Sequence, residues 1–187
     1  TQFLTFFLLP LYTRYLTTAE YGIYDLINTY LILLVPVISL ELFDALFRFL
    51  IDARKDIEKE KQIISSITYG IICIIIIIVI LAIIVGNFIK IEYLYYIIFD
   101  VIAMTFSNIA LQVARGFGSN KDYSIGSIIT AFLTITISGT FLIFTNYKIN
   151  GILLSIGIAN FACFIYIFFR LKLYNFISRM AFQKVQL

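Results

Sequence analysis

Long apolar runs separated by short polar segments dominate the chain. Each complete run is close to the twenty residues or so that an α-helix needs to cross the hydrocarbon core of a bilayer. The pattern predicts an all-α fold, a polytopic transmembrane helical bundle of about six helices. The expected helices cover residues 1–13, 24–50, 63–85, 93–113, 123–144 and 151–169, in one transmembrane domain over residues 1–187.

The third predicted helix contains the most uniform apolar run, which is mostly isoleucine and valine from Ile71 to Val85. In water, such β-branched residues favour a strand. In lipid, an isolated strand leaves its backbone hydrogen-bonding groups unpaired, so a helix is the expected structure.

Basic residues are distributed unevenly between the connections. Ten of the 14 lie in segments 52–62, 114–122 and 170–187, and three lie in the alternate connections. The ten are Arg54, Lys55, Lys59, Lys61, Arg115, Lys121, Arg170, Lys172, Arg179 and Lys184; the three are Arg14, Lys90 and Lys148. Because lysine and arginine are enriched in cytoplasmic loops, we predict a multi-pass inner (plasma) membrane protein with these three segments and the N-terminus in the cytoplasm.

The composition excludes several classes of function. The chain is 61% hydrophobic and 13% charged, which is too apolar for a soluble domain. It has no histidine, which excludes histidine-based catalysis and metal binding. Cys73 and Cys163 lie in apolar runs without the spacing of metal ligands. We therefore predict no metal site. We also predict no cofactor, no nucleic-acid partner and no enzymatic activity.

The first apolar run, from Phe3 to Tyr12, is about half the length of a membrane-spanning helix. The chain begins with Thr1, and no basic segment or small-residue cleavage site indicates a signal peptide. We therefore expect an N-terminal fragment of a longer protein that continues beyond Leu187.

The junction between the first two predicted helices resembles that of polysaccharide flippases. Its residues are LPLYTRYL at 9–16, followed by TTAEYGIYDL at 17–26. Supporting matches are SLELFDALFRF at 39–49 and the turn ARGFGSNKDY at 114–123. The whole chain is similar to the first six helices of these O-antigen (lipid-linked oligosaccharide) flippases, a family of the multidrug/oligosaccharidyl-lipid/polysaccharide exporter superfamily.

The resemblance implies that this chain is the first bundle of a two-bundle exporter fold and works with the remaining C-terminal bundle. A cavity between the bundles would open to one side of the membrane at a time. Its substrate would be an undecaprenyl-pyrophosphate-linked repeat unit of a surface polysaccharide such as O-antigen or capsule, moved from the cytoplasmic to the outer leaflet. The expected partners are the lipid-linked oligosaccharide, the lipid bilayer and a coupling ion, either H⁺ or Na⁺.

Such a cavity needs cations for the pyrophosphate and polar groups for sugar hydroxyls. In the second predicted helix, Asp44 and Arg48 are four residues apart on one face, with Glu41 on the same side. Arg48 is a candidate substrate-binding residue; a structural ion pair with Asp44 is the alternative. Pro36 is expected to bend this helix toward the cavity. Asp25, near the outer end of the helix, is a candidate for cation coupling or an acid favoured by the helix dipole.

The fourth predicted helix carries a polar stripe. Asp100, Ser107, Asn108 and Arg115 fall near one face at a 3.6-residue period. The stripe should face the cavity or a neighbouring helix rather than lipid. We predict Asn108 and Arg115 as substrate-binding residues and Asp100 as a cation-coupling residue.

Arg14, at the outer end of the first predicted helix, is a further candidate for binding the pyrophosphate. The alternative is a surface ion pair with Glu20. Small and hydroxyl residues in the last two helices predict close helix packing and have no expected ligand. They are Ser127, Thr130, Thr134 and Ser138 in one helix and Gly151, Ser155 and Ala159 in the other.

Two other functions remain open. A multidrug exporter of the same superfamily would carry acids rather than arginines in its cavity. A membrane-embedded polysaccharide polymerase or glycosyltransferase would need sizeable outer loops, and the predicted outer connections are only a few residues long.

Overall fold

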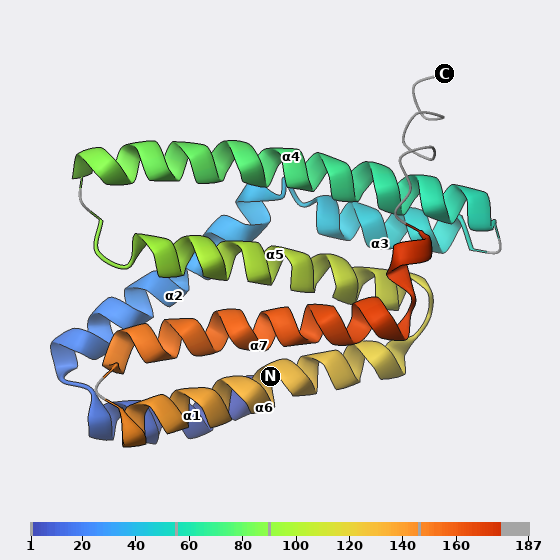
Figure 1. Ribbon diagram of the computed structural model, residues 1–187. Coiled ribbons are helices and arrows are strands. Elements are labelled where there is room, and N and C mark those ends of the chain that lie inside the picture. The colour runs from blue at the N-terminus through green and yellow to red at the C-terminus, as the bar shows by residue number, and fades with distance from the viewer. Residues whose placement is uncertain (1, 55, 90, 146, 177–187) are drawn as a thin grey trace.

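The computed structural model describes residues 2–54, 56–89, 91–145 and 147–176, with side chains for all of them except 2–7 and 89 (Figure 1). Seven α-helices make up this part of the chain. They are α1 (Gln2–Tyr15), α2 (Thr18–Ile38), α3 (Leu42–Asp52), α4 (Ile57–Ile89), α5 (Leu94–Gly116), α6 (Asn120–Phe144) and α7 (Lys148–Arg170). A short 3-10 helix, Leu173–Asn175, follows α7.

Five of these helices are long and apolar enough to cross a membrane: α2, α4, α5, α6 and α7. The other two are shorter, with 14 residues in α1 and 11 in α3. Both fall below the length of about twenty residues that the hydrocarbon core requires. The fold is therefore a polytopic helical membrane bundle, as the apolar runs predict.

The helix predicted over residues 24–50 is interrupted, which corrects the sequence prediction. α2 ends in a Schellman C-cap, in which the N–H groups of Leu40 and Glu41 donate to the carbonyls of Val37 and Pro36. Leu40 and Glu41 have φ values of 50° and 56°, in the left-handed region. This conformation costs a non-glycine residue about 1–2 kcal/mol. Pro36 stays within α2, so the chain changes direction after it, at residues 39–41.

α4 begins at Ile57, six residues before the predicted start, because the charged segment that precedes the apolar run is helical. Asp56 caps this start: its carboxylate accepts the N–H of Lys59 at 3.2 Å and pairs with the Lys59 ammonium, also at 3.2 Å. The hydrogen bond from the Lys59 N–H is the main reason why the pKa of Asp56 lies below its usual value.

The break between α2 and α3 lies part-way along the bundle, and the other connections alternate between its two ends (Figure 1). We call the end with connections 53–56, 117–119 and 171–176 the basic end, and the other the opposite end. Arg54 donates from Nε to the carbonyl of Gly116 at 3.0 Å, and Ser65 of α4 donates to the carbonyl of Phe176 at 2.8 Å. The three connections that the charge pattern groups together therefore meet in space. Four of the residues in that pattern, Lys55, Lys90, Arg179 and Lys184, lie outside the described part of the chain.

α7 packs between α5 and α6, and α4 lies along one edge of the bundle (Figure 1). Gly151, Ser155 and Ala159 of α7 are all buried. A Cβ atom placed on Gly151 would lie only 2.6 Å from the Cβ of Phe141 on α6. The small residues thus allow the close helix approach that the sequence predicts. Cys163 is buried in the core, whereas Cys73 is exposed on α4.

The hydroxyl groups of α6 bond mainly to the backbone of their own helix. Ser127, Thr130, Thr134 and Ser138 donate to the carbonyls of Tyr123, Gly126, Thr130 and Ile135. Each hydroxyl is thereby satisfied without water, which suits a helix in a bilayer.

Candidate functional site

A polar surface on α3 and α5, toward the basic end, is the candidate site. One side of α3 is exposed and carries Glu41, Asp44, Arg48 and Asp52, and the other side is buried through Phe43, Leu46 and Leu50. α5 carries half-buried polar side chains at helical spacing, which are Asn108, Gln112 and Arg115. We call Asp44, Arg48, Asn108, Gln112 and Arg115 the polar face. Polar side chains at such positions do not suit contact with lipid tails.

Hydrogen bonds join the two helices across the polar face. Gln112 donates from Nε2 to Oδ1 of Asp44 at 2.9 Å, and Arg115 donates to Oε1 of Gln112 at 3.1 Å. Gln112 therefore bridges the carboxylate of Asp44 and the guanidinium of Arg115. A guanidinium has five N–H donors, and Arg115 uses one of them in the hydrogen bonds among the described residues.

Aromatic rings hold Arg115 in place. Its guanidinium carbon lies 4.4 Å from the ring centre of Phe47 on α3 and 5.4 Å from that of Tyr123 on α6. Cation–π contacts of this kind contribute about 0.5–1 kcal/mol at exposed sites. Arg115 is thus a positioned cation at a junction of three helices.

Arg48 and Asn108 lie beside this network. Arg48 is exposed one turn after Asp44, and Asn108 is half-buried one turn before Gln112. The ion pair with Asp44 that was the alternative role for Arg48 is not formed among the described residues, and Asp44 accepts a hydrogen bond from Gln112 instead. The ion pairs of the described residues are Lys59–Asp56, Lys148–Glu20 and Arg170–Asp122. The structure therefore brings three predicted residues, Arg48, Asn108 and Arg115, to adjoining helix faces.

The polar stripe predicted on α5 divides into two parts, which corrects the single stripe of the sequence analysis. Asn108 and Arg115 belong to the polar face, but Asp100 and Ser107 are buried, with 0% and 1% exposure. Asp100 faces α7, where a Cβ atom on Gly157 would lie 2.7 Å from its Oδ1. Neither carboxyl oxygen of Asp100 has a hydrogen-bond partner of adequate geometry among the described residues. The predicted coupling residue thus lies in a helix interface.

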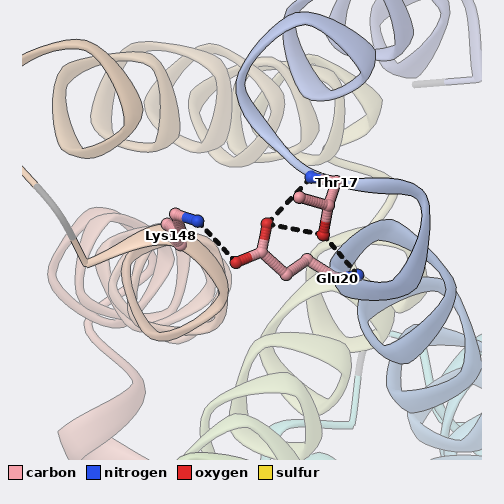
Figure 2. Close-up of polar contacts among 3 residues, drawn as sticks. All are labelled: Thr17, Glu20 and Lys148. Carbon is pink, nitrogen blue, oxygen red and sulfur yellow. Dashed lines mark hydrogen bonds and ion pairs between the residues drawn. The ribbon is translucent and has the colours of Figure 1, made fainter.

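The remaining predicted residues, Asp25 and Arg14, are not part of the polar face. Both side chains are exposed, Asp25 on the second turn of α2 and Arg14 near the end of α1. The guanidinium of Arg14 lies 5.9 Å from the ring centre of Tyr15. Glu20, the alternative partner considered for Arg14, instead accepts a hydrogen bond from Lys148 at 2.6 Å (Figure 2).

Arg54 has a structural role that the sequence analysis did not identify. Its guanidinium bonds to the carbonyls of Gly116 and Arg115 at 3.0 and 3.5 Å, at the C-terminus of α5. A cation there is favoured by the helix dipole and satisfies carbonyls that lack a helical partner. Gly118, which has a φ of 75° just beyond the helix, is the sequence signal for this C-terminus.

Asp122 also forms a network that the sequence analysis missed. Its carboxylate accepts hydrogen bonds from Ser119 Oγ at 2.5 Å, Tyr166 Oη at 3.1 Å and Arg170 Nε at 3.3 Å. These contacts join the start of α6 to the end of α7. The signal in the sequence is the S-x-x-D pattern before an apolar run, which is typical of a helix start.

Among the described residues, no three His, Cys, Asp or Glu side chains come together in an arrangement that could hold a metal ion. Comparisons of the chain with protein-family models, with curated proteins and with solved structures find no match in any of the three. The functional interpretation therefore depends on the polar face and on the arrangement of the helices around it.

Proposed function

We propose that this chain is part of a membrane transporter that moves undecaprenyl-pyrophosphate-linked oligosaccharides from the cytoplasmic to the outer leaflet of the inner membrane. The observation that carries the proposal is the polar face. Its two arginines, Arg48 and Arg115, lie on adjoining helices of a largely apolar bundle. The resemblance of residues 9–26 to polysaccharide flippases supports the same assignment.

The chemistry of the polar face suits a lipid pyrophosphate. Arg115 offers unused N–H donors in a fixed orientation, and Arg48 offers an exposed guanidinium one helix away. Guanidinium groups bind phosphate oxygens through charge-assisted, often bidentate hydrogen bonds. Asn108 and Gln112 add neutral groups of the kind that bind sugar hydroxyls.

The basic end is the cytoplasmic end in this proposal, following the excess of lysine and arginine in its connections. The polar face would then receive the pyrophosphate from the cytoplasmic leaflet. Alternating access requires a second bundle, and the remaining C-terminal bundle of the full-length protein would close the cavity over the polar face.

Asp100 and Asp25 are the proposed coupling residues, with H⁺ or Na⁺ as the ion. A buried carboxyl group without a hydrogen-bond partner is stable only when it is neutral or compensated by a bound cation. Asp100 is such a group, and it lies against Gly157 of α7. Binding or release of H⁺ or Na⁺ at Asp100 would therefore alter the packing of α5 on α7. Asp25 is exposed and would bind its ion only when another element covers it.

The test is a flipping assay on the full-length protein in liposomes, with a fluorescent polyprenyl pyrophosphate that carries one sugar. We expect Arg48→Gln and Arg115→Gln each to slow flipping about tenfold or more, because a hydrogen bond to a charged group contributes about 1.5–3 kcal/mol. Lys172→Gln is the matched control, since Lys172 is exposed at the basic end but lies outside the polar face.

Wild-type flipping rates in both arginine variants would contradict the proposal. Export of cationic drugs without flipping would favour a multidrug exporter, and chain elongation of the probe would favour a polymerase or glycosyltransferase. We propose no catalytic residue in this chain.

A further inference from the structure

A small cavity opens at the opposite end of the bundle, away from the polar face. It has a volume of about 200 Å³ and lies where α2, α5 and α7 begin. Its polar lining consists of Glu20, Tyr93, Tyr147, Lys148 and Asn150. Sites for drug-sized ligands usually measure about 300–1,000 Å³, so this cavity suits a smaller group, about the size of one sugar ring.

The cavity contains an ion pair whose orientation is fixed (Figure 2). Glu20 Oε2 accepts hydrogen bonds from the N–H of Thr17 at 2.8 Å and from its hydroxyl at 2.9 Å, while Oε1 binds the ammonium of Lys148 at 2.6 Å. The capping box of α2 thus holds the carboxylate in place. An ammonium has three N–H donors, so Lys148 keeps donors for a ligand beside a carboxylate that accepts.

One further polar group of the cavity has no hydrogen-bond partner among the described residues. It is the Oδ1 atom of Asn150, which is buried. Burial, the neighbouring charge of Glu92 and a hydrogen bond with the Glu92 side chain raise the pKa of the Tyr93 phenol. Tyr93 therefore stays a neutral hydroxyl, whose oxygen can still accept a hydrogen bond from a ligand. Tyr147 is 58% exposed and offers an open ring beside these groups.

Two of the five non-glycine residues with positive φ in the described part of the chain line this cavity. Tyr93 and Lys148 both have positive φ values, of 54° and 33°. Bulky residues rarely adopt this region, and strain of this kind tends to be retained where it positions functional groups.

The charge and shape of the cavity select among ligands. Glu20 and Lys148 are the charged residues of its described lining and cancel, while Glu92 adds a negative charge beside Tyr93 at its edge. A phosphate or a cationic drug would therefore gain little, whereas a neutral ring with several hydroxyls would match the donors, the acceptors and the tyrosine rings. We propose that this cavity binds a single neutral sugar ring of the transported repeat unit, at the end of the bundle where the repeat unit leaves. The inference rests on the proposed function.

The experiment measures binding of two fluorescent probes to the full-length protein in nanodiscs: a polyprenyl pyrophosphate with one hexose and the same lipid without the sugar. The variants are Tyr147→Ala and Glu20→Gln. The matched control is Tyr95→Ala, because Tyr95 is 76% exposed near the same end of α5 and does not line the cavity. We expect about tenfold weaker binding of the hexose probe to both variants, and no change for the sugar-free probe or the control.

Equal losses for both probes, or no loss for either, would overturn the sugar site. Because Glu20→Gln alters the capping box of α2, Tyr147→Ala decides the outcome if thermal unfolding shows that the Glu20 variant is destabilised. If wild-type protein binds neither probe, this result contradicts the proposed function but does not test the cavity. Saturation-transfer NMR with a free methyl hexoside then tests the cavity separately: a signal that disappears in Tyr147→Ala supports the sugar site, and no signal in wild-type protein overturns it.

Discussion

α4 and α5 are both apolar enough to cross a membrane, but they contribute to the protein in different ways. In their most apolar segments, 17% of the residues of α4 are buried within the protein and 50% of those of α5. α4 exposes a broad isoleucine surface, whereas α5 packs on α2, α3, α4, α6 and α7. Hydropathy identifies both helices as membrane spans. Only the positions of polar and small residues distinguish the helix that faces lipid from the helix that is enclosed by protein.

The largest expected difference in the free energy of unfolding comes from replacing one isoleucine on each helix with alanine. Ile109 of α5 is 4% exposed and belongs to the main core, and Ile77 of α4 is 58% exposed. We expect Ile109→Ala to lower the free energy of unfolding by about 3 kcal/mol, because it leaves a cavity among packed side chains. Ile77→Ala should change it by less than about 0.5 kcal/mol. Unfolding in mixed detergent micelles measures both, and equal losses would remove the distinction between the helices.

A glycine on each helix provides the second comparison. A Cβ atom on Gly116 of α5 would lie 2.7 Å from the Cβ of Leu50, whereas one on Gly70 of α4 meets nothing within 4 Å. We expect Gly116→Ala to destabilise the protein by about 1–3 kcal/mol through overpacking. Gly70→Ala should be neutral or stabilise it by up to about 1 kcal/mol, because alanine favours helix. The same unfolding measurement decides, and a stabilising Gly116→Ala would show that α3 is not packed tightly on α5.

The smallest expected effect tests whether water reaches the polar face. Gln112→Leu removes the link between Asp44 and Arg115, and Gln62→Leu is the matched change on α4. If water solvates the released groups, the loss should stay below about 1 kcal/mol. Gln62→Leu should be close to neutral. A loss above about 2 kcal/mol for Gln112→Leu alone would mean that the polar face is dry.

The sequence predicts the membrane spans well because length and hydropathy depend only on local composition. It does not predict the interruption at residues 39–41, because Leu40 and Glu41 adopt a conformation that usually requires glycine. The Schellman cap forms at these residues despite their conformational cost, so no local residue type signals it.

The candidate site is only partly predictable for a similar reason. Asn108 lies about 80° around α5 from Asp100 at 3.6 residues per turn, so one broad stripe can face two neighbours. Only the packing of α7, with Gly157 opposite Asp100, places Asp100 in an interface and leaves Asn108 and Arg115 on the polar face. The contact of Arg54 with α5 is likewise beyond sequence reasoning, since it joins residues that are 62 positions apart.

The length of α4 has a consequence for how a ligand reaches the polar face. Its 33 residues measure about 50 Å at 1.5 Å per residue, against a hydrocarbon core of about 30 Å. Its charged first turns at the basic end therefore extend into the headgroup layer, and α3 packs beside α4. The C-terminal turn of α3, which leads into α4, is then near the depth of the lipid headgroups. Under the function proposed above, a lipid-borne anion would approach it sideways, by diffusion within its own leaflet, without first passing through water.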